Sequence, residues 1–234
     1  MADTSSWEFN DGIVPIFDKH VRDHVPMYEE FHRLITDISG WFIDNETSVY
    51  DIGTSSGEVI KNLKGTYGHK NVKYFGVDAS PEMVSEAKSR FVNDSDVYIT
   101  QDDVTSNHFE IVNASLAVSV LTLMFIKKRY RQDVVNKIYN GLNDGGAFIL
   151  VEKVVGNNAN FDSIFVDLYH DFKLRNGLTE KQVFEKARSI RGVLRPNTFA
   201  ENLQMLTTAG FENTDVFFKW NNFVGIVAIK GGVR

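Results

Sequence analysis

The chain of 234 residues contains no cysteine and only four prolines. The absence of cysteine excludes disulfides, thiolate nucleophiles, zinc–thiolate clusters and iron–sulfur ligation. A chain of this length can bury roughly 70–75% of its unfolded surface, so it needs no such cross-link to be stable. Internal repeats, low-complexity segments and proline-rich linkers are also missing. The sequence therefore predicts one continuous domain, residues 1–234.

The chain also has no excess of positive charge and no long apolar run. The net charge of −6 opposes a nucleic-acid-binding role, because such binding draws its affinity from clustered Lys and Arg. The longest uncharged run, Ile111 to Ile126, is shorter than the ~20 residues that span a bilayer. The start, Met1 to Trp7, lacks the apolar stretch of a signal peptide. We expect a cytoplasmic protein that acts on a small molecule, without nucleic-acid or membrane partners.

Short apolar or β-branched runs alternate with amphipathic stretches along the middle of the chain. One of these helical stretches has a clear start at Ser80-Pro81, with serine as N-cap and proline at the first helical position, and another is expected to close with a turn at 143–146. This alternation predicts right-handed crossovers and a parallel sheet with helices on both faces. The runs that we interpret as strands are 48–52, 72–77, 97–101, 116–121 and 147–151.

Both ends of the chain depart from this alternation. Apolar residues from Met27 to Phe42 recur at helical spacing and predict a helix that covers the core as a lid. At the other end, the strand-like runs Thr214–Trp220 and Phe223–Lys230 are separated only by Asn221-Asn222, which is hairpin spacing. The predicted fold is α/β and doubly wound, Rossmann-like, with a mostly parallel seven-stranded sheet, a C-terminal antiparallel hairpin and an N-terminal helical lid. The hairpin favours the methyltransferase variant of this fold.

Within the single domain we expect four parts. They are a helical lid (1–46), a cofactor-binding core (47–155), a helical region for substrate or dimer contacts (156–212) and the hairpin (213–232). The third part is predicted to hold three helices, one with its apolar face over 164–172, one over 180–189 and one over 198–208.

Three acidic residues follow successive predicted strands, at the edge where doubly wound sheets bind their ligands. Asp51 precedes a loop with Gly53 and Gly57 that lacks the middle glycine of the pyrophosphate motif G-x-G-x-x-G. A carboxylate there repels a pyrophosphate but attracts an ammonium group, as in a sulfonium nucleoside amino acid. Asp78 is placed to accept hydrogen bonds from ribose hydroxyls, and Asp103 from an adenine amino group.

Each of these features also has a simpler interpretation. Glycine-rich turns occur in many α/β proteins that bind no nucleotide, Asp78 could help to cap the helix at Ser80, and Asp103 could be a turn aspartate. Together, however, the three carboxylates favour S-adenosylmethionine (SAM) as the ligand.

At these motifs the sequence resembles the class I SAM-dependent methyltransferases and, within them, the carboxy-SAM synthases. The similarity extends from about Phe17 to Lys230. The first-strand motif is generic to the superfamily, whereas the His-Asp-Phe-Lys block is far more specific. The matching segments are Pro26–Tyr28, Tyr50–Gly57, Val77–Met83, Lys137–Asn143, Glu152-Lys153, His170–Lys173, Asn176-Gly177, Arg188-Ser189 and Ala209–Phe211.

The resemblance implies a set of cofactor contacts. In order along the chain these are Tyr28 from the lid, Asp51, Gly53, Thr54 and Ser55 at the amino-acid end, Asp78 and Ala79 at the ribose, Asp103 and Val104 at the adenine, and position 120. The sequence departs from the family at two of these positions. Val120 stands where the family has an asparagine, and Ala79 replaces an asparagine after the ribose acid.

The resemblance also implies catalytic residues. Arg188 matches the arginine that pairs with the carboxyl group added to the sulfonium methyl carbon, a task that suits the rigid guanidinium fork. Tyr28 would help to exclude water, and His170 is either a general base or structural. His20 and His24 are spaced like metal ligands, but no third ligand converges on them, so no metal is expected.

The function implied by the resemblance is a homodimeric carboxy-SAM synthase. It would convert SAM and prephenate to carboxy-SAM and phenylpyruvate, for tRNA wobble-uridine modification. Two alternatives remain open at this point. One is a conventional SAM-dependent methyltransferase acting on a small molecule, which Val120 slightly favours. The other is a non-catalytic SAM-binding or dimerisation module.

Overall fold

The computed structural model describes residues 17–231, so the predicted absence of a signal peptide at Met1 to Trp7 lies outside the described residues. The helices are α1 (Phe17–His24), α2 (Tyr28–Ser39), α3 (Glu58–Tyr67), α4 (Pro81–Arg90), η2 (Leu123–Phe125), α5 (Lys128–Gly141), α6 (Ala159–Arg175), α7 (Glu180–Ser189) and α8 (Phe199–Ala209). The strands are β1 (Ser48–Ile52), β2 (Lys73–Asp78), β3 (Val97–Gln101), β4 (Ala114–Val120), β5 (Leu142–Val155), β6 (Asn197–Thr198), β7 (Asn213–Trp220) and β8 (Phe223–Ile229).

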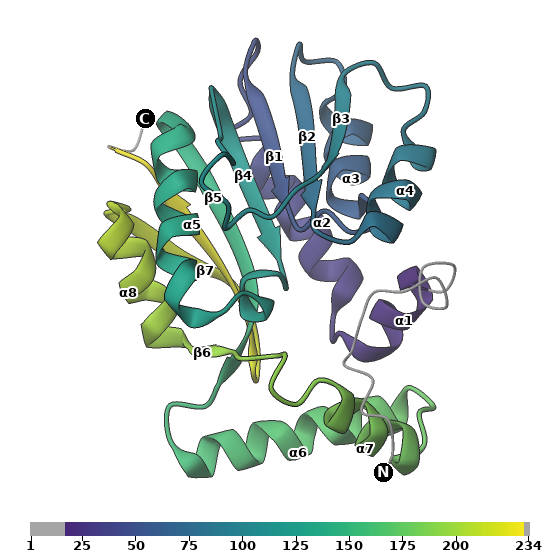
Figure 1. Ribbon diagram of the computed structural model, residues 1–234. Coiled ribbons are helices and arrows are strands. Elements are labelled where there is room, and N and C mark those ends of the chain that lie inside the picture. Colours follow the sequence, from purple (N-terminus) through teal and green to yellow (C-terminus); the bar gives the residue numbers. More distant parts are fainter. Residues whose placement is uncertain (1–16, 232–234) are drawn as a thin grey trace.

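The described strands form one twisted sheet in the order β3-β2-β1-β4-β5-β8-β7 (Figure 1). Strands β1 to β5 pair in parallel, whereas β8 pairs antiparallel with both β5 and β7. These seven strands confirm the predicted doubly wound sheet and its C-terminal hairpin. An additional strand, β6, pairs with Val154–Val155. We did not predict it, because two residues carry no periodic signal.

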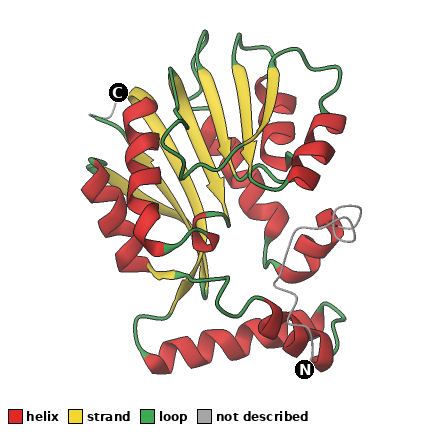
Figure 2. Ribbon diagram, in the orientation of Figure 1, coloured by secondary structure: helices red, strands yellow, loops and turns green. Residues whose placement is uncertain are grey.

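Helices cover both faces of the sheet (Figure 2). On one face, α2 and α3 bury side chains such as Phe31 and Leu63 against β1 and β4. On the other face, α5 and α8 bury Ile138 and Leu206 against β5 and β8. Complete burial of such side chains contributes about 1.5–3 kcal/mol each. The two apolar clusters fix the strands, and thereby the loops at their carboxyl ends.

Two predicted element boundaries are wrong, those of β5 and α2. The turn expected at 143–146 belongs instead to β5, because the N–H of Gly145 donates to the Lys230 carbonyl and the N–H of Lys230 donates to the Gly146 carbonyl. The predicted apolar face of the helix from Met27 to Phe42 included Trp41, but this residue is 86% exposed. That helix ends at Ser39, so Trp41 is no longer on its buried face.

Helix α1 and the α6–α7 pair lie near the carboxyl edge of the parallel strands, in the lower part of Figure 1. The predicted helices of this region are present, and α7 has the expected bounds. It begins with a capping box between Thr179 and Gln182. Within residues 17–231, we find no helix that is both long and apolar enough to cross a membrane.

Candidate active site

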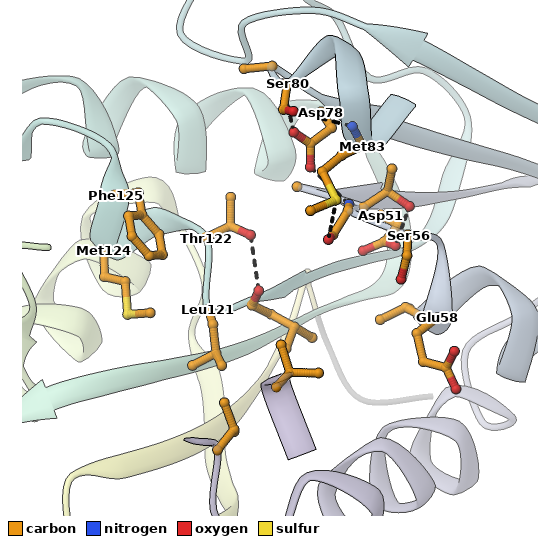
Figure 3. A pocket seen from close by; sticks show the side chains of 18 of the residues that line it. Asp51, Ser56, Glu58, Asp78, Ser80, Met83, Leu121, Thr122, Met124 and Phe125 are labelled. Carbon is orange, nitrogen blue, oxygen red and sulfur yellow. Dashed lines mark hydrogen bonds between the residues drawn. The ribbon is translucent and has the colours of Figure 1, made fainter. Parts of the chain in front are cut away.

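A cavity of about 420 Å³ lies at the carboxyl ends of β1, β2 and β4. Its size falls within the range of roughly 300–1,000 Å³ that is typical of small-molecule sites. The loops after β1 and β2 face the segment from Leu121 to Phe125 across the cavity (Figure 3). The ten predicted cofactor contacts all line it: Tyr28, Asp51, Gly53, Thr54, Ser55, Asp78, Ala79, Asp103, Val104 and Val120. The structure thus brings together residues that are far apart in the sequence.

The loop after β1 has a backbone that requires glycine. Gly53 has a φ of 77°, and a β-carbon at this position would lie 2.2 Å from the Thr122 Oγ1 atom. Both the positive φ and the close approach of the neighbouring loop therefore exclude a side chain. This close packing brings the loop after β1 against the loop after β4 and closes one side of the cavity.

Asp51, the penultimate residue of β1, has a strongly perturbed carboxyl group. It is 1% exposed and accepts a hydrogen bond of 2.7 Å from the Thr54 hydroxyl. Burial raises the pKa of Asp51 to about 7; the Thr54 hydrogen bond opposes this shift, and the nearby charge of Asp78 adds to it. A buried carboxylate beside a second one is stabilised by a cation. The site therefore favours a ligand with an ammonium or sulfonium group.

The Asp78 carboxylate is fixed by backbone donors on two sides. The N–H of Ser55 donates to its Oδ2 and the N–H of Ser80 to its Oδ1, each at 2.9 Å. Ser80 itself caps α4 by accepting from the N–H of Met83 at 3.2 Å. Burial raises the pKa of Asp78, while these backbone hydrogen bonds lower it. The N–H of Ala79 is a third backbone donor to this carboxylate, which with about four lone-pair sites can still accept a hydrogen bond from a ribose hydroxyl.

Asp103 combines the two interpretations that its sequence context allowed. Its Oδ1 accepts from the N–H of Thr105 at 2.9 Å and from the Thr105 hydroxyl at 2.7 Å, so it forms a local turn. Its Oδ2 has no hydrogen bond with the described part of the chain, and the residue lines the cavity beside buried Val104. A turn aspartate of this kind can still accept a bond from an adenine amino group.

Sequence reasoning gave no role to Glu152, although it shapes the site. This side chain is 2% exposed and accepts a hydrogen bond of 3.0 Å from the N–H of Leu123, with further bonds from the N–H groups of Thr122 and Met124. Burial raises the pKa of Glu152 to about 8, against the lowering effect of Arg131. The carboxyl group thus fixes the loop that faces Asp51 across the cavity. The apolar side chain of Val120 immediately precedes this loop.

The structure does not bring Arg188 or His170 to the cavity. Arg188 is exposed on α7, where its guanidinium lies 5.6 Å from the ring centroid of Phe184. The residue of α7 that lines the cavity is Lys186, two positions earlier. Burial lowers the pKa of His170, and the charges of Lys173 and Lys153 lower it further. The neighbouring residue, Tyr169, lines the cavity instead.

Lysines at the α6–α7 side of the cavity were also missed. Lys153 and Lys186 line it, and the Nζ atoms of Lys153 and Lys173 lie 4.3 Å and 4.0 Å from the ring centroid of Tyr169. Lys153 and Lys173 belong to segments that carry the family resemblance, but we gave them no role. For Lys186 a signal was present, because Val183, Lys186 and Ile190 are spaced along one face of a helix.

We found no group of three or more His, Cys, Asp or Glu placed to hold a metal ion in the described residues, 17–231.

Comparisons with known proteins agree with this geometry. A methyltransferase-domain profile matches residues 49–146. The chain is 45% identical over 217 residues to carboxy-S-adenosyl-L-methionine synthase of Staphylococcus epidermidis, with 92% of each chain covered. It is 39% identical over 225 residues to the enzyme of that name from Methylococcus capsulatus, covering 95% of this chain and 93% of that one.

Solved structures share the fold at low sequence identity. An O-methyltransferase family protein of Burkholderia thailandensis has a TM-score of 0.69 at 11% identity, covering 94% of this chain and 60% of that one. The YcgJ protein of Bacillus subtilis has a TM-score of 0.64 at 15% identity, covering 88% of this chain and 100% of that one.

The fold and the site define a SAM-dependent transferase that uses SAM as cofactor or substrate. These findings confirm the predicted Rossmann-like methyltransferase fold, the predicted SAM-dependent transferase class and SAM as the predicted ligand. The chain belongs to the carboxy-S-adenosyl-L-methionine synthase family.

Proposed function

We propose that this protein converts SAM to carboxy-SAM, with prephenate as the carboxyl donor. The observation that carries the proposal is the charge distribution of the cavity. Asp51 and Asp78 line its acidic end from β1 and β2, and Lys153 and Lys186 line its basic end from β5, which β4 separates from β1, and from α7. A sulfonium nucleoside amino acid needs the acidic end, and an acidic second substrate needs the basic end. The sequence relationship to carboxy-SAM synthases supports the same assignment.

The proposed chemistry uses the acidity of the methyl protons next to the sulfonium. Prephenate loses carbon dioxide and hydroxide and becomes phenylpyruvate. The hydroxide leaves as water with one methyl proton, and the resulting ylide carbon forms a bond to the carbon dioxide. Capture requires that water be excluded and that a cation stabilise the new carboxylate. Tyr28, whose ring lies 4.3 Å from that of His32, covers the cavity from α2.

We propose that Arg188 pairs with the new carboxylate, although in a single chain this residue does not line the cavity. Arg188 is exposed and beside Phe184, which is 60% exposed. Phe161, Ile164 and Leu168 form a further exposed apolar face on α6. We propose that a second copy of the chain covers these residues, within the 156–212 region, to give a homodimer. Arg188 then acts at the dimer interface or after a shift of α7.

The remaining parts of the proposal concern the cellular role. We propose a cytoplasmic enzyme without a nucleic-acid or membrane partner of its own. Its product would be used by a separate transferase in tRNA wobble-uridine modification. The net charge of −6 supports the absence of a direct tRNA contact, because a tRNA-binding surface requires clustered cations.

Mass spectrometry of the nucleoside that co-purifies with the protein tests the proposal. We expect a compound heavier than SAM by one carboxyl group. In Arg188→Ala we expect SAM to be retained and the carboxylated species to be lost. Only SAM or its demethylated product in the wild-type protein would contradict the proposal.

The second candidate is a conventional methyltransferase acting on a small molecule. Val120 favours it, because an apolar side chain lines the cavity where the family has an asparagine. For such a reaction, proximity and in-line geometry provide most of the rate enhancement. Formation of S-adenosylhomocysteine with an added acceptor, and no turnover with prephenate, would select this candidate.

A further inference from the structure

The segment from Leu121 to Ile126, which we call the wall loop, follows β4 and contains the short helix η2. It faces the loops after β1 and β2 across the cavity (Figure 3). Its turn is closed by backbone hydrogen bonds of 3.0 Å, from the N–H of Phe125 to the Thr122 carbonyl and from the N–H of Ile126 to the Leu123 carbonyl. The other backbone groups of the wall loop need partners from elsewhere in the fold.

Two buried charged side chains supply such partners from opposite ends of the turn. Glu152 accepts from the N–H of Leu123 and from the N–H groups of its two neighbours. Arg131 of α5, which is 2% exposed, donates from Nε to the Ile126 carbonyl at 2.8 Å and from Nη2 to the Met124 carbonyl at 3.1 Å. The carboxylate thus meets the N–H groups that begin the turn, and the guanidinium meets the carbonyls that end it, as the peptide dipoles favour.

The same guanidinium holds a second segment, residues 195–197, which lies between α7 and α8. Nη2 of Arg131 donates to the Arg195 carbonyl at 2.6 Å, and Nη1 donates to Oδ1 of Asn197 at 2.9 Å. Asn197 is fixed in turn, because its Nδ2 donates to Oδ1 of Asn202 at 2.9 Å. The N–H of Arg195 also donates to the Met124 carbonyl at 3.0 Å, so the two segments are in direct contact.

The second segment continues directly from another wall of the cavity. Ile190 and Leu194, which follow α7, line the cavity on the side opposite neither strand end but beside Lys186 of the same helix. Arg131 does not line the cavity itself. It lies behind the wall loop and behind the segment after α7, and it bonds to both. A planar guanidinium suits this task because its donors point in fixed directions.

Packing of α5 alone does not account for an arginine at this position. The next inward-facing residues of the helix, Val134, Val135 and Ile138, are apolar. Burial lowers the pKa of Arg131, and the charges of Glu152 and Glu201 oppose this shift. An apolar side chain would avoid the desolvation of a buried charge, and such replacements are often neutral or stabilising. What an apolar side chain could not provide is the set of directed hydrogen bonds to two segments.

We infer that Arg131 is a positioning residue that fixes the wall loop relative to the segment after α7, and thereby sets the shape of the cavity that binds SAM. It acts through the carbonyl groups of Met124, Ile126 and Arg195 and touches no ligand. The inference goes beyond the proposed carboxyl transfer, because a cavity of fixed shape serves carboxyl transfer and methyl transfer alike.

Calorimetric titration with S-adenosylhomocysteine tests the inference without turnover. Arg131→Lys keeps the charge, but a single ammonium group cannot reproduce four hydrogen bonds that diverge from one plane. We expect the Kd for S-adenosylhomocysteine to rise at least fivefold in this variant. Arg129→Lys is the matched control, because Arg129 is exposed on the same helix, and its Kd should stay within twofold of the wild type.

A second control separates positioning from a loss of stability. Ile138→Ala removes fully buried apolar contacts from α5 without touching the wall loop or residues 195–197. Urea unfolding should show that this variant is less stable than the wild type, whereas its Kd for S-adenosylhomocysteine should stay within twofold. A merely structural role of Arg131 predicts the opposite, namely that the two α5 variants change the Kd in proportion to their loss of stability.

Two results would overturn the inference: a rise of less than fivefold in the Kd of Arg131→Lys, or an equal rise in Ile138→Ala. If Arg131→Lys does not fold, Asn197→Ala decides, because it removes one of the hydrogen bonds of Arg131 and lies outside the cavity. We expect it to raise the Kd at least threefold, and a smaller rise would contradict the positioning role. Failure of the proposed function is distinguishable, because the wild type would then bind S-adenosylhomocysteine in the same way but form no carboxy-SAM from prephenate.

Discussion

The two ends of the cavity differ in how their residues are held. At the acidic end, Asp51 and Asp78 lie at the carboxyl ends of β1 and β2, and nearby hydroxyl and backbone donors fix their carboxylates. At the basic end, Lys153, Lys173 and Lys186 come from one strand and two helices, and an aromatic ring rather than a hydrogen-bond network supports two of them. The acidic end is organised by local chain geometry, and the basic end by the docking of α6 and α7.

This contrast predicts different responses to substitution. Changes at the acidic end should reduce cofactor affinity, because each group makes a specific contact. Changes at the basic end should leave cofactor affinity intact and should even stabilise the fold, because burial disfavours the charged forms of these lysines.

The largest effect is expected for Asp78→Ala. This variant should raise the Kd for SAM about 100-fold, because it removes the charged acceptor of a ribose hydrogen bond, which contributes up to about 3 kcal/mol. Titration calorimetry measures the change. Asp37→Ala, an exposed aspartate paired with Arg33 on α2, is the control and should leave the Kd unchanged. A Kd for the Asp78 variant within threefold of the wild type would remove Asp78 from the ribose site.

Gly53→Ala should lower the free energy of unfolding by about 1–3 kcal/mol, because it places a side chain at positive φ. The clash with Thr122 adds to the strain. Gly65→Ala is the matched control, since Gly65 lies within α3 and a β-carbon there meets no atom within 4 Å. That control should stabilise the protein by up to about 1 kcal/mol. Urea unfolding of both variants checks the prediction, and equal stabilities would contradict it.

The affinity for SAM should rise about tenfold between pH 6 and pH 8. The reason is that the pKa of Asp51 is raised to about 7, so the carboxylate that attracts the cationic ligand forms in this range. The stability of the fold should change in the opposite direction, because the folded protein holds the Asp51 proton more tightly than the unfolded chain does. The contribution of Asp51 to the free energy of unfolding is complete below pH 3.8 and is lost as the pH rises through 7. Asp51→Asn should bind SAM more weakly and without this pH dependence; a dependence that persists in the variant would assign it to another group.

The smallest effect is expected at the basic end. Lys173→Met should raise the Tm by about 2–4 °C, because it removes a buried cation that repels Lys153 and Lys186. Differential scanning calorimetry at pH 7 measures the shift. A lower Tm would mean that Lys173 stabilises the fold through contacts other than those described above.

The residues of the acidic end could be predicted from the sequence, because each of them is marked by a pattern of neighbouring residues. A glycine-containing loop after a buried strand and an acid after each of the next two strands predict a common edge, and all ten predicted cofactor contacts line one cavity. Their individual roles stay predictions. The parallel sheet and the C-terminal hairpin were likewise predictable from periodicity and turn spacing, whereas the order of the strands was not predicted.

The basic end could not be predicted in the same way because it depends on tertiary packing. Arg188 and Lys186 lie two residues apart on α7 and therefore point to different sides of the helix, and only its docking decides which one faces the cavity. The lysine cluster joins β5 to α6 and α7 across segments that no local pattern links. The strand character of residues 143–146 depends similarly on Lys230, near the other end of the chain.

The proposed carboxyl transfer is tested most directly with prephenate labelled isotopically in the carboxyl group that it loses. The protein is incubated with unlabelled SAM and labelled prephenate, and the nucleoside products are analysed by mass spectrometry. We predict that the label appears on a nucleoside heavier than SAM by one carboxyl group. Unlabelled SAM or S-adenosylhomocysteine as the sole nucleoside products would contradict the account.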